Sequence, residues 1–177
     1  ETLIERTKEN AFEHYEISNF AKEGCRSQHN SIYWNDIKYL GLGPSAHSYD
    51  GSSRQWNVAN LTQYINTDFD TDYDTDFDAD YDTDYDTDFD TDTYSGLYFE
   101  REFLTRDDKY NEYVMTSLRT SWGCNVKKIT TDYGISYANH FLKNIKKYLD
   151  SGVMINRDDN FILTDKGMLF ADGIASE

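Results

Sequence analysis

Two histidines stand among large aromatic residues in one short stretch of the chain. His29, Tyr33 and Trp34 lie within six residues of one another, and His47 precedes Tyr49 by two positions. Haem iron binds an axial histidine, and the porphyrin plane prefers aromatic and apolar walls. The first set therefore has the residue types that a haem site requires, and the second set offers a further imidazole.

The same residues also have a purely structural interpretation. His29 and Asn30 could close a loop by hydrogen bonding, while Tyr33 and Trp34 seal the core as buried aromatic side chains do. Cys25, four residues before His29, could supply a thiolate ligand, although an ordinary loop thiol is the simpler interpretation. The residue types alone leave the binding and the structural interpretations open.

A glycine turn follows in the same stretch. Gly41 and Gly43 flank Leu42, and Pro44 comes next, so the backbone is expected to turn tightly and to approach a neighbouring group closely. A dinucleotide-binding loop is excluded, because the third glycine of that fingerprint and the helix that follows it are missing.

Several ordered motifs resemble those of a known family. They are His-Asn-x-x-Tyr-Trp, the following Tyr-Leu-Gly-Leu-Gly-Pro-Ser-Ala-His-Ser-Tyr, and the segments 14–21, 54–58, 111–115 and 118–120. Together they resemble the radical-SAM family of oxygen-independent coproporphyrinogen III oxidase-like proteins, in particular its haem chaperone branch. The resemblance covers most of the chain except residues 67–93.

The resemblance implies that haem or a related tetrapyrrole is handled and passed to a recipient protein that the sequence does not identify. It implies haem contacts from the motif residues His29, Asn30, Tyr33 and Trp34, with His29 on the iron, and it allows His47 a role in lining a substrate or SAM pocket. It also implies a [4Fe–4S] cluster and SAM in a full-length parent. The CxxxCxxC motif for that cluster is missing from this sequence, so we expect a catalytically inert C-terminal portion. The alternative is an accessory region of an oxidase that decarboxylates coproporphyrinogen III.

The charge of the chain is concentrated in one repeat. The net charge is −16, but residues 67–93 hold 13 Asp and no Lys or Arg, so the remainder carries 17 basic and 20 acidic residues. The total charge therefore predicts no class of partner. The Thr-Asp-Phe/Tyr-Asp repeat is expected to be a flexible insertion. A calcium-binding surface is the alternative, against which the absence of glycines counts.

Two cysteines and the absence of long apolar runs bear on location. Cys25 and Cys124 are far apart and form no CxxC cluster, which is typical of reduced thiols rather than of a disulfide framework. No apolar run approaches the ~20 residues that a membrane span requires. We therefore expect a soluble, cytoplasmic protein without a membrane span.

The order of predicted elements indicates an α+β fold in three parts. Residues 1–66 are expected to be the end of a radical-SAM barrel with the His-Asn-x-x-Tyr-Trp loop region, residues 67–94 the acidic insertion, and residues 95–177 a mostly helical, winged-helix-like domain. Hydrophobic periodicity and turn residues predict these elements: a helix over 1–10, a strand over 12–20, a loop over 21–31, a strand over 54–58, and helices over 61–65, 105–122 and 136–150, then a hairpin of 153–155 with 161–163, and a last helix capped by Thr164.

A winged-helix-like end invites the hypothesis of an interaction module that binds nucleic acid. The hairpin offers only Arg157, beside Asp158 and Asp159. A nucleic-acid interface would present a concentrated basic face. We therefore expect no nucleic acid as a partner.

Overall fold

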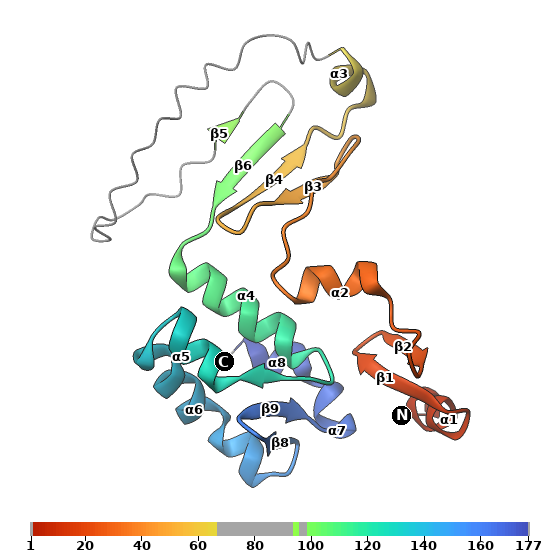
Figure 1. Cartoon of the computed structure of the whole chain (residues 1–177), viewed down its shortest axis with the longest axis vertical. Coiled ribbons are helices and arrows are strands. Elements are labelled where there is room, and N and C mark those ends of the chain that lie inside the picture. Colours follow the sequence, from red (N-terminus) through yellow and green to blue (C-terminus); the bar gives the residue numbers. More distant parts are fainter. Residues whose placement is uncertain (1, 67–93, 96–98, 177) are drawn as a thin grey trace. The chain divides into compact units, whose positions relative to one another are not determined.

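The computed structural model describes residues 2–66, 94–95 and 99–176. It confirms an α+β fold, shown in Figure 1. The chain forms two compact units, one of residues 1–37 with 106–177 and one of residues 38–105. Except for its last residue, the aspartate repeat predicted over 67–94 lies outside the described residues. No helix within the described ranges is long and apolar enough to cross a membrane.

The first unit begins with a helix and a hairpin. Helix α1 (Thr2–Glu9) leads into β1 (Phe12–Glu16), which pairs antiparallel with β2 (Asn19–Lys22), and α2 (Gln28–Trp34) follows. The prediction of one continuous strand over 12–20 is wrong, because the chain turns back after Glu16, whose carboxylate accepts a hydrogen bond from the Ser18 backbone N–H. The edge of β1 is thereby paired within the chain.

The C-terminal part of this unit packs helices around a small sheet (Figure 1). Its elements are α4 (Arg106–Leu118), β7 (Cys124–Asn125), α5 (Val126–Asp132), α6 (Ile135–Asp150), β8 (Met154–Arg157), β9 (Asn160–Leu163), α7 (Asp165–Met168) and α8 (Ala171–Ala175). The sheet order is β7-β9-β8. Each of these elements contributes at least one buried apolar residue to a single core, which includes Leu118, Ile129 and Phe141.

Most of the predicted C-terminal elements are confirmed, with three differences. Helix α4 ends at Leu118 rather than near residue 122, the short helix α5 is additional, and the last helix is divided into α7 and α8. The hairpin of β8 and β9 is confirmed. Thr164 caps α7 as predicted, because its side chain accepts a hydrogen bond from the Gly167 N–H.

The second unit is built on a four-stranded antiparallel sheet. Its strands are β3 (His47–Tyr49), β4 (Ser53–Asn57), β5 (Tyr94–Ser95) and β6 (Phe99–Phe103), in the order β3-β4-β6-β5. Helix α3 (Leu61–Ile65) follows β4 and is capped by the Asn60 side chain. The strand predicted over 54–58 and the helix predicted over 61–65 are both present within one residue of their expected bounds.

The turn between β3 and β4 depends on one carboxylate. Asp50 accepts hydrogen bonds from the backbone N–H groups and the hydroxyl groups of Ser52 and Ser53. Burial raises the pKa of Asp50, but these hydrogen bonds outweigh burial and lower the pKa to about 2. The ionised carboxylate is therefore the form that stabilises the turn.

This hydrogen bonding predicts acid sensitivity of the second unit. A carboxyl group with a lowered pKa in the folded state contributes stability above its unfolded pKa and loses that contribution as the pH falls through the folded value. We expect hydrogen-exchange protection of β3 and β4 to decrease between about pH 4 and pH 2. In Asp50→Asn, protection at pH 6 should already be lower, and this part of the pH dependence should be absent. An unchanged pH profile in the variant would contradict the assignment.

Candidate functional site

The His-Asn-x-x-Tyr-Trp motif lies on helix α2, not in the loop predicted over residues 21–31. Ser27 caps the helix, since its Oγ accepts a hydrogen bond from the Asn30 N–H at 3.2 Å and its carbonyl accepts one from the Ser31 hydroxyl at 2.8 Å. On a helix, residues four apart share a face. His29 therefore shares one face of α2 with Tyr33, and Asn30 shares the adjacent face with Trp34.

The first pair lies on the outer face of α2. The imidazole of His29 is exposed and the Tyr33 side chain is 46% exposed. Their rings meet edge to face, with centroids 5.3 Å apart and planes at 88°, and the Tyr33 hydroxyl lies 3.3 Å from His29 Nε2. The prediction that Tyr33 seals the core is wrong, because the ring faces outward. An accessible imidazole beside an aromatic ring has the chemistry of an iron ligand with a porphyrin contact.

The second pair holds α2 on the rest of the unit. Trp34 is half-buried, and its ring lies 6.0 Å from that of the buried Tyr15 and 6.1 Å from that of Trp122. The Asn30 amide donates a hydrogen bond to the Asn19 side chain at 3.3 Å. The structural interpretation of the motif thus holds for Asn30 and Trp34, whereas His29 and Tyr33 are left accessible.

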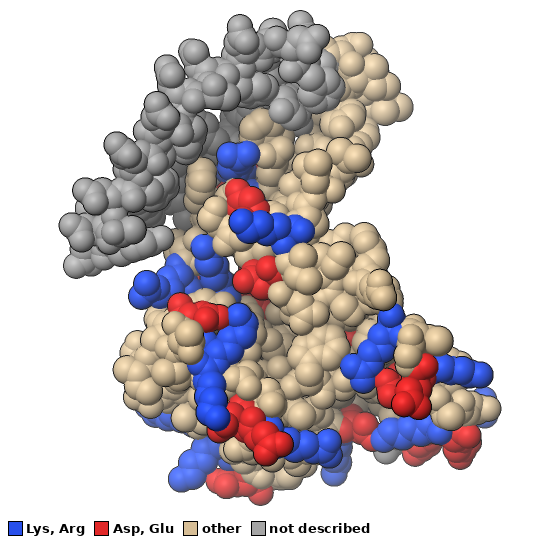
Figure 2. All heavy atoms as spheres, viewed as in Figure 1, with Lys and Arg blue, Asp and Glu red and all other residues tan. Residues whose placement is uncertain are grey.

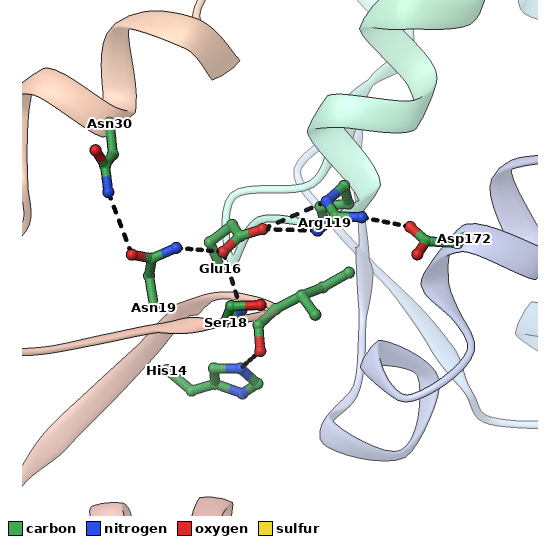
Figure 3. A network of polar contacts seen from close by, with 8 residues as sticks. His14, Glu16, Ser18, Asn19, Asn30, Arg119 and Asp172 are labelled. Carbon is green, nitrogen blue, oxygen red and sulfur yellow. Dashed lines mark hydrogen bonds and ion pairs between the residues drawn. The ribbon is translucent and has the colours of Figure 1, made fainter.

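Behind Asn30 lies a network of polar contacts centred on Glu16, shown in Figure 3. The Glu16 residue is only 3% exposed. One carboxylate oxygen accepts hydrogen bonds from the Ser18 N–H and the Asn19 amide, and the other accepts from Arg119 Nε and Nη2 at 3.3 and 3.2 Å. Arg119 also pairs with Asp172 of α8 at 2.5 Å. Sequence reasoning assigned no role to these residues, although Glu16, Asn19 and Arg119 lie in two of the motifs that carried the resemblance.

His47 lies in the second unit, at the start of β3. Its side chain is exposed, and its ring lies 6.2 Å from that of Trp56, its partner residue on β4. The predicted close approach of the glycine turn is confirmed, because a Cβ on Gly41 would lie 2.1 Å from the His47 carbonyl oxygen. Asn57 fixes the turn by donating to the Gly43 carbonyl at 2.9 Å and to the Gly41 carbonyl at 3.4 Å.

The residues of this chain do not fit an iron–sulfur cluster. The sequence contains two cysteines, of which Cys25 is exposed and Cys124 is buried. A CxxxCxxC cluster requires three thiolates. Among the described residues, no group of three or more His, Cys, Asp and Glu side chains is arranged to hold a metal ion. Cluster chemistry is therefore not assigned to residues of this chain.

The two thiols should differ sharply in reactivity. Burial raises the pKa of Cys124 to about 12, against which a hydrogen bond with Tyr113 acts, and the residue is 0% exposed. Thiolate, not thiol, is the nucleophile. At pH 8 we expect an aromatic disulfide reagent to titrate one thiol in the folded protein and two after denaturation. Cys25→Ser should leave no rapidly reacting thiol, and rapid reaction of two thiols in the folded chain would contradict this assignment.

Comparisons with known proteins relate this chain to the HemN C-terminal domain and to the HemW heme chaperones. Residues 104–170 match the HemN C-terminal domain family. The chain is 28% identical over 174 residues to the heme chaperone HemW of Bacillus subtilis and 21% identical over 174 residues to that of Lactococcus lactis. Each alignment covers 98% of this chain, but only 40% and 39% of the relative. The chain thus spans about 40% of the length of these relatives.

A solved structure shows the same fold. It is coproporphyrinogen III oxidase (HemN) from Escherichia coli, described as a radical SAM enzyme, with a TM-score of 0.62 and 18% sequence identity over 99% of this chain and 38% of that one. At this identity the similarity concerns the fold alone. The sequence matches show that residues 104–170 match the HemN C-terminal domain and that the chain is homologous to a portion of the HemW heme chaperones.

Proposed function

We propose that this chain handles haem, or a related tetrapyrrole, as the haem-contacting portion of a heme chaperone-like protein. The observation that carries the proposal is the division of the motif on α2. Asn30 and Trp34 hold the helix, while His29 and Tyr33 are presented together on its accessible face. Haem is the cargo in this proposal, and His29 is its axial ligand.

The other predicted contacts take supporting roles in the proposal. Tyr33 lies against the imidazole, where its ring can contact the porphyrin plane and its hydroxyl can orient His29. Trp34 acts through packing and Asn30 through hydrogen bonding, so neither is proposed to touch haem directly. His47 is a second candidate contact, carried by the other unit beside Trp56.

The [4Fe–4S] cluster and SAM are assigned in this proposal to the part of the relatives that this chain does not span. The oxidase role, suggested by the fold of HemN, is the second candidate, and the His29–Tyr33 pair favours the chaperone role. The two cysteines form no disulfide with each other and are typical of a reducing compartment, so the cytoplasm is the proposed site of action.

The C-terminal elements follow the order of a winged-helix domain, with α4, β7, α5 and α6 before the β8–β9 hairpin. We propose on this basis that the C-terminal part of the chain is a winged-helix domain. On the face shown in Figure 2, basic and acidic side chains are interspersed. Lys127 pairs with Asp159 at 2.7 Å, and Lys128 pairs with Asp132 at 2.5 Å. Such pairing does not favour phosphate binding, so nucleic acid is not proposed as a partner.

A haem titration followed by Soret absorbance tests the proposed function. Wild type should saturate at one haem per chain, and His29→Ala should bind at least about 10-fold more weakly. His140→Ala is the matched control, because His140 is also an exposed helical histidine close to a tyrosine ring, that of Tyr110 at 6.5 Å. Equal affinities of wild type and His29→Ala would overturn the proposal.

A further inference from the structure

Three separate sequence motifs are joined in one polar network around the buried carboxylate of Glu16. The segment 14–21 supplies Glu16 and Asn19, the segment 118–120 supplies Arg119, and the His-Asn-x-x-Tyr-Trp motif supplies Asn30 (Figure 3). Glu16 and Arg119 are 103 positions apart in the sequence. The motifs that carried the resemblance are therefore joined physically, in a contact that is distinct from the accessible face of α2.

Backbone contacts bring the two outer segments together independently of these side chains. The Ile17 N–H donates to the Arg119 carbonyl at 3.0 Å, and the Ser121 N–H donates to the Tyr15 carbonyl at 3.0 Å. Glu16 also forms an antiparallel bridge with Thr120. The end of β1 is thus attached to the segment after α4 by main-chain hydrogen bonds, so the hairpin keeps its place when a side chain of the network is changed.

Helix α2, in contrast, is held in place by few contacts of its own residues. It has seven residues, none of which is buried. Isolated helices of this length are not stable in water, so tertiary contacts must fix the helix. Besides the packing of Trp34, two polar contacts join α2 and its cap to the hairpin: the Asn30 amide to Asn19 Oδ1, and the Ser27 N–H to the Tyr15 hydroxyl at 3.3 Å.

We infer that Glu16 and Asn19 are positioning residues for the ligand-binding face of α2. The Asn19 amide donates to Glu16, which leaves the Asn19 carbonyl oxygen directed at the Asn30 amide. Glu16 in turn is fixed by Arg119 through two nitrogens. This relay sets the rotation of α2 at Asn30, and therefore which way His29 and Tyr33 point. The effect on haem rests on the proposed function, whereas the effect on α2 does not.

Hydrogen exchange of the α2 amides in Asn19→Ala tests this inference without any ligand. Loss of one relay hydrogen bond should speed exchange over residues 28–34 on the order of 10-fold. Glu16→Gln keeps the shape but replaces one of the two accepting oxygens by an NH2 group that cannot accept, so it should also speed this exchange. Asn160→Ala is the matched control, because it removes an amide–amide hydrogen bond of 2.9 Å with Asn125 elsewhere in the same unit. Its α2 exchange should equal that of wild type.

Haem titration of the same variants links the relay to binding. Asn19→Ala should bind haem on the order of 10-fold more weakly while its thermal midpoint stays close to that of Asn160→Ala. Unchanged α2 exchange in both Asn19→Ala and Glu16→Gln would overturn the inference, whether or not haem binds. Faster α2 exchange in a protein whose wild type binds no haem would keep the positioning role and reject the proposed function instead.

Discussion

Replacing Gly41 by alanine should cost the second unit about 3 kcal/mol of folding free energy. A Cβ at this position would lie 2.1 Å from the His47 carbonyl oxygen and 2.7 Å from its carbon. Both are backbone atoms of β3, so no side-chain rotation can relieve the clash. The turn must move away from β3, which also weakens the hydrogen bond from the Gly41 N–H to the Ser48 hydroxyl at 3.0 Å.

Hydrogen exchange of β3 and β4 in denaturant measures this loss, because it reports on the second unit alone. Gly173→Ala is the matched control. An added Cβ on Gly173 would meet no atom within 4 Å, and its backbone is helical in α8, so the substitution should be neutral or slightly stabilising. Equal protection of β3 in Gly41→Ala and Gly173→Ala would show that the turn does not depend on the close approach.

Replacing Trp34 by alanine should destabilise the first unit by about 3 kcal/mol, whereas Tyr33→Ala should cost less than about 1 kcal/mol. The two aromatic residues are adjacent in the sequence but face different surroundings. Trp34 packs on Tyr15 and Trp122, while Tyr33 is 46% exposed and its ring meets that of His29 edge to face.

Urea unfolding, monitored by far-UV circular dichroism, gives the free energies of both variants, and haem titration shows whether Tyr33→Ala loses binding without losing stability. Tyr33→Ala should keep its stability and bind haem more weakly. Trp34→Phe, which keeps an aromatic ring, should recover most of the stability lost in Trp34→Ala. If Tyr33→Ala were the less stable of the two alanine variants, the division of the motif into an accessible and a packed pair would be wrong.

Hydrophobic periodicity was a good guide to the C-terminal domain. Helix α6 has a strong apolar stripe, and its buried residues Phe141 and Ile145 lie four apart, so the helix could be predicted within one residue of its start. Helix α5 escaped prediction because only Ile129 of its seven residues is buried. A helix with one buried residue has no periodicity to detect.

The candidate site was harder to predict because its structure depends on contacts between distant residues. Alternation in the segment 12–20 predicts one strand, whereas the pairing of β1 with β2 and the hydrogen bond from Ser18 to Glu16 show that the chain reverses there. Helix α2 has no buried residue, so its sequence shows no apolar periodicity and was predicted in part as a loop. Its clearest local signal is Ser27, a residue type that often caps helices. The partner of Glu16, Arg119, is 103 positions away and carries no local signal.

The identity of the iron ligand tests the account most directly. Electron–nuclear double resonance on the ferric haem complex of the whole chain, produced with ¹⁵N-labelled histidine, detects a protein histidine bound to iron. We expect a ¹⁵N coupling in wild type and in His140→Ala, and none in His29→Ala. A coupling that persists in His29→Ala, or its absence from a wild-type complex that holds haem, would contradict the assignment of His29 as the ligand.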